Sequence, residues 1–206
     1  MYNVITNLMK GDAPVVFSRW GDGEWNCIFQ TSPGHWNCDE HVYFPDLGIE
    51  LGKVLEGKPQ YHLGIQGLAR KIHGARIDKW LSDRGLEFNW DYSDEFHDAA
   101  QRGDWEFKDV FTAKDHCIVG PDHLRKVFTG KFVEVVKQNC WLNTDETLAK
   151  IVDVIENGVE TIGFCAGMAS NVWIDRIAKT FSGISLIDFG SVFDPLAGVK
   201  SRAYMQ

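Results

Sequence analysis

Residues 15–25 have the sequence VVFSRWGDGEW, in which an apolar run leads into two acids that alternate with glycines. The apolar start is typical of a buried strand. Gly21 and Gly23 allow the backbone to turn tightly and to approach a ligand closely. Asp22 and Glu24 offer the hard oxygen ligands that Mg²⁺ or Mn²⁺ prefers. We therefore expect this loop to hold a metal ion and a phosphorylated ligand.

The glycine spacing of this loop also fits other interpretations. A dinucleotide fingerprint would need a third glycine where Asn26 stands, and two carboxylates would repel a pyrophosphate unless a cation bridged them, so we exclude it. Arg19 instead adds a fixed positive charge that suits a phosphate. A structural alternative is a surface turn in which Asp22 bonds local backbone and Glu24 opens the next helix. Spacing alone leaves the metal loop and the turn both open.

Apolar runs and helical patterns alternate along the chain. Five short apolar runs are each followed by glycine, polar or acidic residues, at 15–17, 61–65, 117–119, 161–165 and 184–189. The clearest helical pattern covers residues 144–157, with Asn143 as a candidate cap and Gly158 as a stop. A second helix is predicted from about residue 169 to 181.

This alternation predicts an α/β fold, Rossmann-like, with a mostly parallel sheet flanked by helices. Ligands of such sheets bind outside the carboxyl ends of the strands, so the loops after the five runs are expected to meet in one pocket. The chain has 206 residues, is 44% hydrophobic and has no long polar linker. We therefore expect a single domain over residues 1–206.

Residues 18–24 carry a resemblance to a known family. The run SRWGDGE resembles the arginine-aromatic-Gly-Asp-Gly-Glu signature of the GT-D-type glycosyltransferases, whose Asp-x-Glu motif replaces the more familiar Asp-x-Asp. Further matches follow in the family's order, at residues 63–66, 118–121, 164–169 and 186–191. The resemblance spans roughly residues 13–195, nearly the whole chain.

The resemblance implies a metal-dependent glycosyltransferase that moves a sugar from a nucleotide-sugar donor to an acceptor hydroxyl on a glycan or glycoprotein. UDP-glucose is the donor to try first. Asp22 and Glu24 are the implied ligands of Mn²⁺ or Mg²⁺, and two acids suffice only if the donor completes the coordination shell. The implied donor-binding residues are Arg19, Gly21, Gly23, Gln66, Gly120, Gly167 and Ser191.

The general base is not defined by the resemblance. Ser191 stands where the family pattern often has histidine. Asp188, at the end of a predicted strand, could orient a sugar hydroxyl or take a proton from the acceptor. Asp194 and His123 are the other candidates, although Asp194 could equally form a turn with the proline that follows it.

The net charge of the chain bears on which alternative functions are favoured. A net charge of -8 argues against a protein built to grip nucleic acid, so a phage-type transfer to a hydroxymethylated base in DNA ranks second. A hypothesis of another class is a nucleotide-sugar binding module without transfer, and a third is a metal-dependent phosphohydrolase. No apolar run reaches 18 residues and no secretory signal precedes Pro14, so we expect a soluble, cytoplasmic protein without a membrane partner.

Two other stretches contain residue types that can carry a function. Cys27, His35, Cys38 and His41 are ligand-type residues, but they lack the paired spacing of a zinc site, so ordinary packed or exposed side chains are the favoured interpretation. The acidic, aromatic segment 88–111 is predicted to contain a short helix and a long connection. It could line the acceptor side of the pocket or simply cover the sheet.

Overall fold

The computed structural model describes residues 3–31 and 41–200. Within these residues, seven strands form one sheet in the order β3-β2-β1-β7-β6-β4-β5, and every pairing is parallel. The strands are β1 (Val16–Trp20), β2 (His62–Ile65), β3 (Asp91–Tyr92), β4 (His116–Gly120), β5 (Lys131–Glu134), β6 (Thr161–Phe164) and β7 (Ser185–Asp188). The predicted α/β fold is confirmed, and the sheet is parallel throughout.

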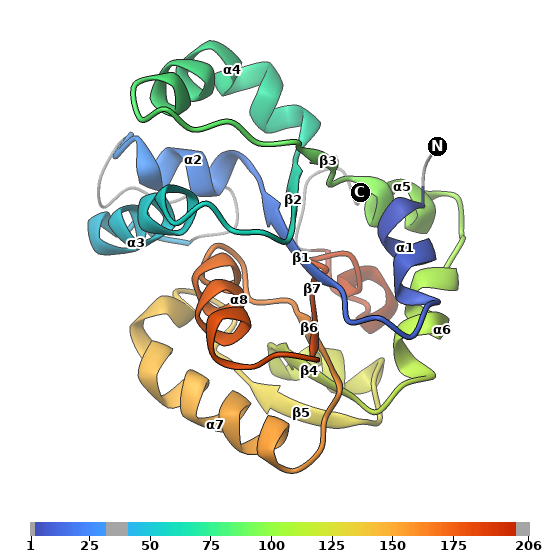
Figure 1. The fold of residues 1–206 in the computed structure, drawn as a ribbon. Helices are drawn as coiled ribbons and strands as arrows, with labels where there is room; N and C mark the ends of the chain where they lie inside the picture. The colour runs from blue at the N-terminus through green and yellow to red at the C-terminus, as the bar shows by residue number, and fades with distance from the viewer. Residues whose placement is uncertain (1–2, 32–40, 201–206) are drawn as a thin grey trace.

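Helices cover both faces of the sheet (Figure 1). One face carries α1 (Val4–Met9), α5 (Glu95–Gln101) and α6 (Glu106–Thr112). The other side carries α2 (Asp22–Ile28), α3 (Pro45–Glu56), α4 (Gly67–Ser82), α7 (Thr144–Glu156) and α8 (Ala169–Thr180). Three short 3₁₀ helices in the described residues are η1 (Asp122–Lys126), η2 (Cys140–Asn143) and η3 (Asp194–Ala197).

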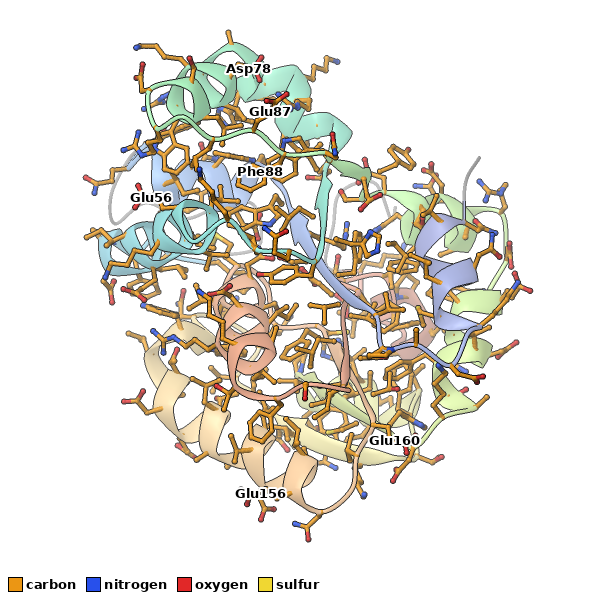
Figure 2. All side chains as sticks on the ribbon, in the orientation of Figure 1. Glu56, Asp78, Glu87, Phe88, Glu156 and Glu160 are labelled. Atoms are coloured by element: carbon orange, nitrogen blue, oxygen red, sulfur yellow. The ribbon has the colours of Figure 1, made fainter. Side chains whose placement is uncertain are left out.

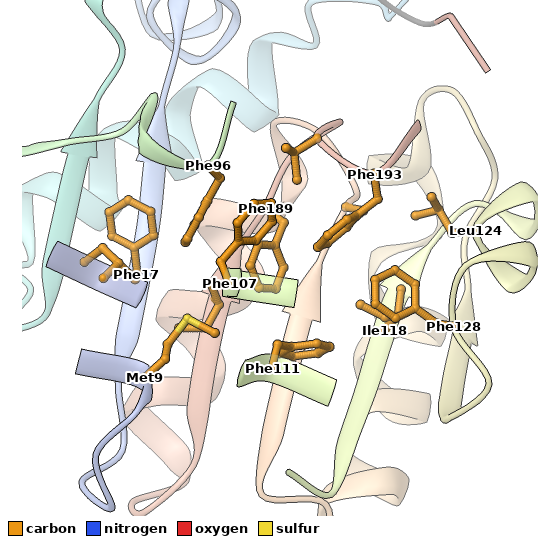
Figure 3. Close-up of a cluster of buried hydrophobic side chains, with 14 of the residues drawn as sticks. Met9, Phe17, Phe96, Phe107, Phe111, Ile118, Leu124, Phe128, Phe189 and Phe193 are labelled. Atoms are coloured by element: carbon orange, nitrogen blue, oxygen red, sulfur yellow. The ribbon is translucent and has the colours of Figure 1, made fainter. Parts of the chain in front are cut away.

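Alternate strand residues supply the two layers of the core. Phe17, Ile118 and Ile187 face a cluster that is rich in phenylalanine and lies under α1, α5 and α6 (Figure 3). Leu186, next to Ile187 in β7, packs into the opposite layer instead. This period of two is what a strand buried on both faces requires. Aromatic pairs such as Phe96 and Phe189, with centroids 5.0 Å apart, contribute about 0.5–1.5 kcal/mol beyond their buried area.

The five predicted strands are all present, and two more were missed. β1 runs on to Trp20, three residues beyond the end of the apolar run at 15–17. β3 has only two residues, and β5 is an edge strand with Lys131 and Glu134 exposed, so neither shows a long apolar run. The two predicted helices are confirmed as α7 and α8. Asn143 precedes α7 as predicted, but its side chain makes no capping hydrogen bond.

The connections after β1 and β7 leave the sheet on opposite sides. β1 leads into α2, whose Trp25 is buried in the layer of α3 and α4. β7 leads to Phe193 and η3, which belong to the phenylalanine-rich layer. Adjacent parallel strands whose connections diverge in this way open a crevice at their carboxyl ends, which is the usual ligand site of such sheets.

Several acidic side chains lie at the periphery of the molecule. Glu56, Asp78, Glu156 and Glu160 project from the periphery of the molecule (Figure 2). These carboxylates therefore contribute to the net charge of -8 without crowding the carboxyl edge of the central strands. Among the described residues, none of the helices combines the length and the apolar character needed to span a bilayer.

Candidate functional site

Asp22 and Glu24 lie in the first turn of α2, at the carboxyl end of β1. The Asp22 carboxylate is half-buried and has no hydrogen-bond or ion-pair partner among the described residues. Glu24 is buried, and its Oε2 accepts the N–H of Gly21 at 2.8 Å. Glu24 thus caps α2 as the structural interpretation predicted, while Asp22 keeps the free oxygens that a metal ion would need.

Three acids are electrostatically coupled at this edge. The pKa of Glu24 is raised to about 7, mainly by burial and to a smaller extent by the nearby charges of Asp188 and Asp22. Burial also raises the pKa of Asp188 to about 6, although the Arg19 charge opposes this. Negative charge is therefore costly in this crevice, and a bound cation would offset that cost.

Gly21 and Gln66 bring the loops of β1 and β2 together. The N–H of Gln66 donates to the Trp20 carbonyl at 2.9 Å. A Cβ added at Gly21 would lie 2.9 Å from Oε1 of Gln66 and 3.1 Å from Oε2 of Glu24. No side chain fits there without displacing one of these two groups, so the glycine keeps both polar side chains against the loop.

Asp188 ends β7 with both carboxylate oxygens engaged. Oδ1 accepts the N–H of Gly190 at 2.9 Å, and Oδ2 accepts the N–H of Arg19 at 3.3 Å. The side chain is buried. These contacts are those of a residue that fixes the ends of β1 and β7, and they leave Asp188 poorly placed to take a proton from an acceptor.

The Arg19 side chain joins three loops of the carboxyl edge. Nε donates to the carbonyl of Ser93 at 3.0 Å, and Nη1 donates to the carbonyl of Phe189 at 3.0 Å. Nη2 lies 3.2 Å from Nδ1 of His97 and 4.0 Å from Asp94. With a side chain only 11% exposed, Arg19 is mainly a residue that positions loops, and its contact with a donor phosphate stays a prediction.

Gly120 is placed inside the packing of the sheet. A Cβ there would lie 2.9 Å from Cδ1 of Leu124 and 3.2 Å from Cβ of Cys165. Its carbonyl accepts the N–H of Val135 at 3.0 Å. Close packing therefore accounts for this glycine without a ligand, and the structure gives no separate support for its predicted contact with the donor.

Other predicted donor-binding residues lie nearer the surface of the same edge. Gly167 is half-exposed after β6 with φ +60, a left-handed conformation that favours glycine. Ser191 is half-exposed after β7, and its carbonyl accepts the N–H of Asp194 at 3.1 Å. Gly23 is half-exposed as the second residue of α2. These positions are compatible with access to a ligand, which stays a prediction.

His123 and Asp194 form a pair at the β4 side of the edge. Nε2 of His123 lies 2.8 Å from Oδ1 of Asp194, although the two residues are 71 positions apart. Both side chains are largely buried, with 16% and 9% exposed. Two of the three candidate bases are thus brought together, while Asp188 stands apart with its own partners.

The zinc hypothesis gains no support. His35 and Cys38 lie outside the described residues. Cys27 is buried with its Sγ 3.6 Å from Sδ of Met168, and burial raises the pKa of its thiol to about 12. Within 3–31 and 41–200, no group of three or more histidine, cysteine or acidic side chains could hold a metal ion. A cation at Asp22 would therefore need ligands from a bound molecule or water.

One buried residue that positions the site was not predicted from the sequence. Asn171 of α8 is fully buried; its Nδ2 donates to the Arg19 carbonyl at 2.8 Å, and its Oδ1 accepts the hydroxyl of Ser18. Asn171 is one of several buried polar residues of α8, with Ser170 and Asp175, so its position in the sequence did not single it out. Its side chain connects α8 to the end of β1, just before the loop that carries Asp22.

Comparison with known proteins supports the fold. No family model matches the chain, and no curated protein matches it either. Among solved structures, the domain of unknown function 1792, described as having a distinct glycosyltransferase fold, aligns with a TM-score of 0.64 at 15% identity, over 95% of this chain and 76% of that one. A new glycosyltransferase (DUF1792) from Streptococcus sanguinis aligns with a TM-score of 0.64 at 14% identity, over 93% and 80%. The chain therefore shares its fold with proteins described as glycosyltransferases.

Proposed function

We propose that this protein is a metal-dependent glycosyltransferase that moves a sugar from a nucleotide-sugar donor to an acceptor hydroxyl. The observation that carries the proposal is the unpartnered Asp22 carboxylate, which lies beside two buried acids at the carboxyl edge of the sheet. The fold shared with proteins described as glycosyltransferases supports the same reaction. The GT-D-like signature around Asp22 and Glu24 adds the nucleotide-sugar donor to the proposal.

The residues of the crevice fit a divalent cation and a diphosphate. A cation bound there would neutralise the charge that grows on the leaving diphosphate. Asp22 would hold it directly, and Glu24, whose Oε2 is used by the Gly21 N–H, would contribute its other oxygen or act through water. Gln66 follows β2, which is next to β1, and the half-exposed Gly167 follows β6 on the other side of β1 and β7; from these two loops of the carboxyl edge they would contact the donor.

The first test is a panel of nucleotide sugars, beginning with UDP-glucose, incubated with the protein and Mn²⁺. Free nucleoside diphosphate and free sugar are measured with and without candidate acceptors. Donor turnover that depends on an acceptor supports transfer. Release of a monophosphate would instead indicate a phosphohydrolase, and a thermal shift without turnover would indicate a binding module.

The Asp22→Asn variant tests the metal site directly. We expect it to abolish the thermal shift produced by Mn²⁺ with donor, because an amide is a poor ligand for a divalent cation. Asp12→Asn is the matched control, since Asp12 is exposed before β1. An Asp22→Asn variant with a wild-type shift and wild-type turnover would exclude Asp22 as the metal ligand.

The acceptor is proposed to be a hydroxyl of a glycan or glycoprotein. A hydroxymethylated base in DNA is the second candidate, and it needs a basic surface and an extruded base. In α4, Arg70 pairs with Asp78 at 2.6 Å, and Arg76 packs over the Phe29 ring at 4.2 Å. Because these cations already have partners, glycan and glycoprotein acceptors are tried before hydroxymethylated DNA.

A further inference from the structure

His123 and Asp194 come from different parts of the carboxyl edge. His123 belongs to η1, which begins directly after β4, and Asp194 begins η3, which follows β7. Nε2 of His123 lies 2.8 Å from Oδ1 of Asp194. With Asp194 ionised, the proton of the neutral imidazole stays on Nε2, and Nδ1 carries the lone pair. Within the described residues Nδ1 has no hydrogen-bond or ion-pair partner.

The pair is held rigidly by the residues next to it in sequence. Leu124 and Phe193 are both fully buried in the phenylalanine-rich cluster (Figure 3). Phe193 also packs edge-on against Phe128, with ring centroids 4.8 Å apart. Since each partner is anchored by a buried neighbour, the imidazole has a fixed orientation without a ligand, which is the preorganisation that a catalytic group requires.

The pair lies on the same edge as the acidic crevice. Burial raises the pKa of the Cys165 thiol, and the charges of Asp194 and Asp188 both raise it further, so both carboxylates are near this one side chain. In the strand order β1-β7-β6-β4, three spacings separate the Asp22 loop from η1. At roughly 4.8 Å for each spacing this is about 14 Å, a distance that a bound donor and acceptor together could span between the cation site and His123.

We propose that His123 is the general base that takes the proton of the acceptor hydroxyl, with Asp194 as its positioning residue. This inference rests on the proposed glycosyl transfer. The acceptor oxygen forms a bond to the anomeric carbon, and the bond from that carbon to the diphosphate oxygen breaks with its electron pair leaving on the diphosphate. The acceptor proton moves to Nδ1 of His123. Asp188 is the weaker choice because both its oxygens accept main-chain N–H groups.

The charged groups around His123 define the expected pH dependence. Asp194 faces it from η3, and the Cys165 thiol is close enough to Asp194 to feel its charge. On η1 itself, Asp122 and Arg125 are paired with each other at 3.2 Å. The rate of turnover should therefore rise with pH as one group loses a proton, and this acidic limb of the pH profile should belong to His123.

The test uses the whole protein with Mn²⁺ and UDP-glucose, or the first nucleotide sugar of the panel that the wild type turns over. Release of the nucleoside diphosphate is measured with water as acceptor and with a p-nitrophenyl glycoside. We expect His123→Gln to lower turnover by about 100-fold or more while donor binding, measured by calorimetry, is unchanged. The acidic limb should disappear, and added imidazole should restore part of the activity of His123→Ala. Asp194→Asn should lower turnover less than His123→Gln does.

Asp122→Asn is the matched control, because Asp122 is exposed on the same short helix and pairs only with Arg125 among the described residues. Wild-type turnover and an unchanged pH profile in His123→Gln would overturn the inference while the transfer reaction stood. Loss of donor binding together with turnover would also overturn it, because the pair would then be structural. A wild-type protein that turns over no nucleotide sugar would overturn the proposed function, and with it the role of His123.

Discussion

The main-chain N–H of Arg19 donates to Oδ2 of Asp188 at 3.3 Å, where a parallel sheet would normally offer a backbone carbonyl. The ladder between β1 and β7 covers only Val16 with Leu186 and Phe17 with Ile187. Beyond it, the Arg19 carbonyl also takes a side-chain partner, the amide of Asn171 at 2.8 Å. Side chains therefore replace the ladder where the two strands separate and the crevice opens.

Replacement of Asn171 by alanine should destabilise the protein by about 1–3 kcal/mol, because it leaves the Arg19 carbonyl and the Ser18 hydroxyl buried without their partner. Unfolding in urea measures the change. Asn7→Ala is the control, since Asn7 is exposed on α1 and accepts only from Lys10. Equal stability of the two variants would show that water replaces the Asn171 contacts.

The sequence was sufficient for the five inner strands of the sheet but not for its two edge strands or for the partners of the site residues. Apolar runs that end in glycine or acids identify central strands, because burial on both faces dictates their composition. β5 was missed because an edge strand with Lys131 and Glu134 exposed needs no apolar run. β3 was missed because two residues cannot show a period.

The acids of the site were found from local spacing, whereas their roles depend on distant contacts. Glu24 caps Gly21 three residues away, so its structural role could be read from the capping-box spacing. The link between His123 and Asp194 spans 71 positions. The hydrogen bond from Arg19 to Ser93 spans 74 positions. Both contacts form only when the sheet brings these distant segments together. A single sequence carries no local signal for such pairs.

Gly190→Ala should destabilise the protein more than Gly103→Ala. Both glycines have left-handed backbone, with φ +59 and φ +74, so both variants incur a backbone strain of about 1 kcal/mol. At Gly103 a Cβ meets nothing within 4 Å, whereas at Gly190 it would overlap Nη1 of Arg19. The urea midpoint of unfolding is measured for both variants. The amount by which the Gly190→Ala midpoint is lower reports the destabilisation caused by displacing the Arg19 side chain. Equal midpoints would mean that Arg19 moves aside freely.

Gly21→Ala should impair binding more than folding. The new Cβ would press on the side chains of Gln66 and Glu24, whose ends can shift, so we expect a loss of stability of about 1–2 kcal/mol and a weakened thermal shift with Mn²⁺ and donor. Gly74→Ala is the control, because it lies in α4 with open space and should gain about 0.5–1 kcal/mol. Should Gly21→Ala keep the full thermal shift, the Gly21 loop is not a wall of the donor site.

Glu24→Gln should become more stable relative to the wild type as the pH rises. The pKa of Glu24 is about 7 in the folded protein against an ordinary value of 4.5, so between these values the folded state holds more protons than the unfolded one. Wild-type stability therefore falls as the pH rises through this window and levels off above it, by an amount on the order of 3 kcal/mol. The glutamine keeps an oxygen for the Gly21 N–H but carries no charge. Urea unfolding at pH 5, 6, 7 and 8 measures the difference, with the exposed Glu160→Gln as control. A difference that stays constant across this series would mean that Glu24 ionises in the folded protein as it does in the unfolded chain.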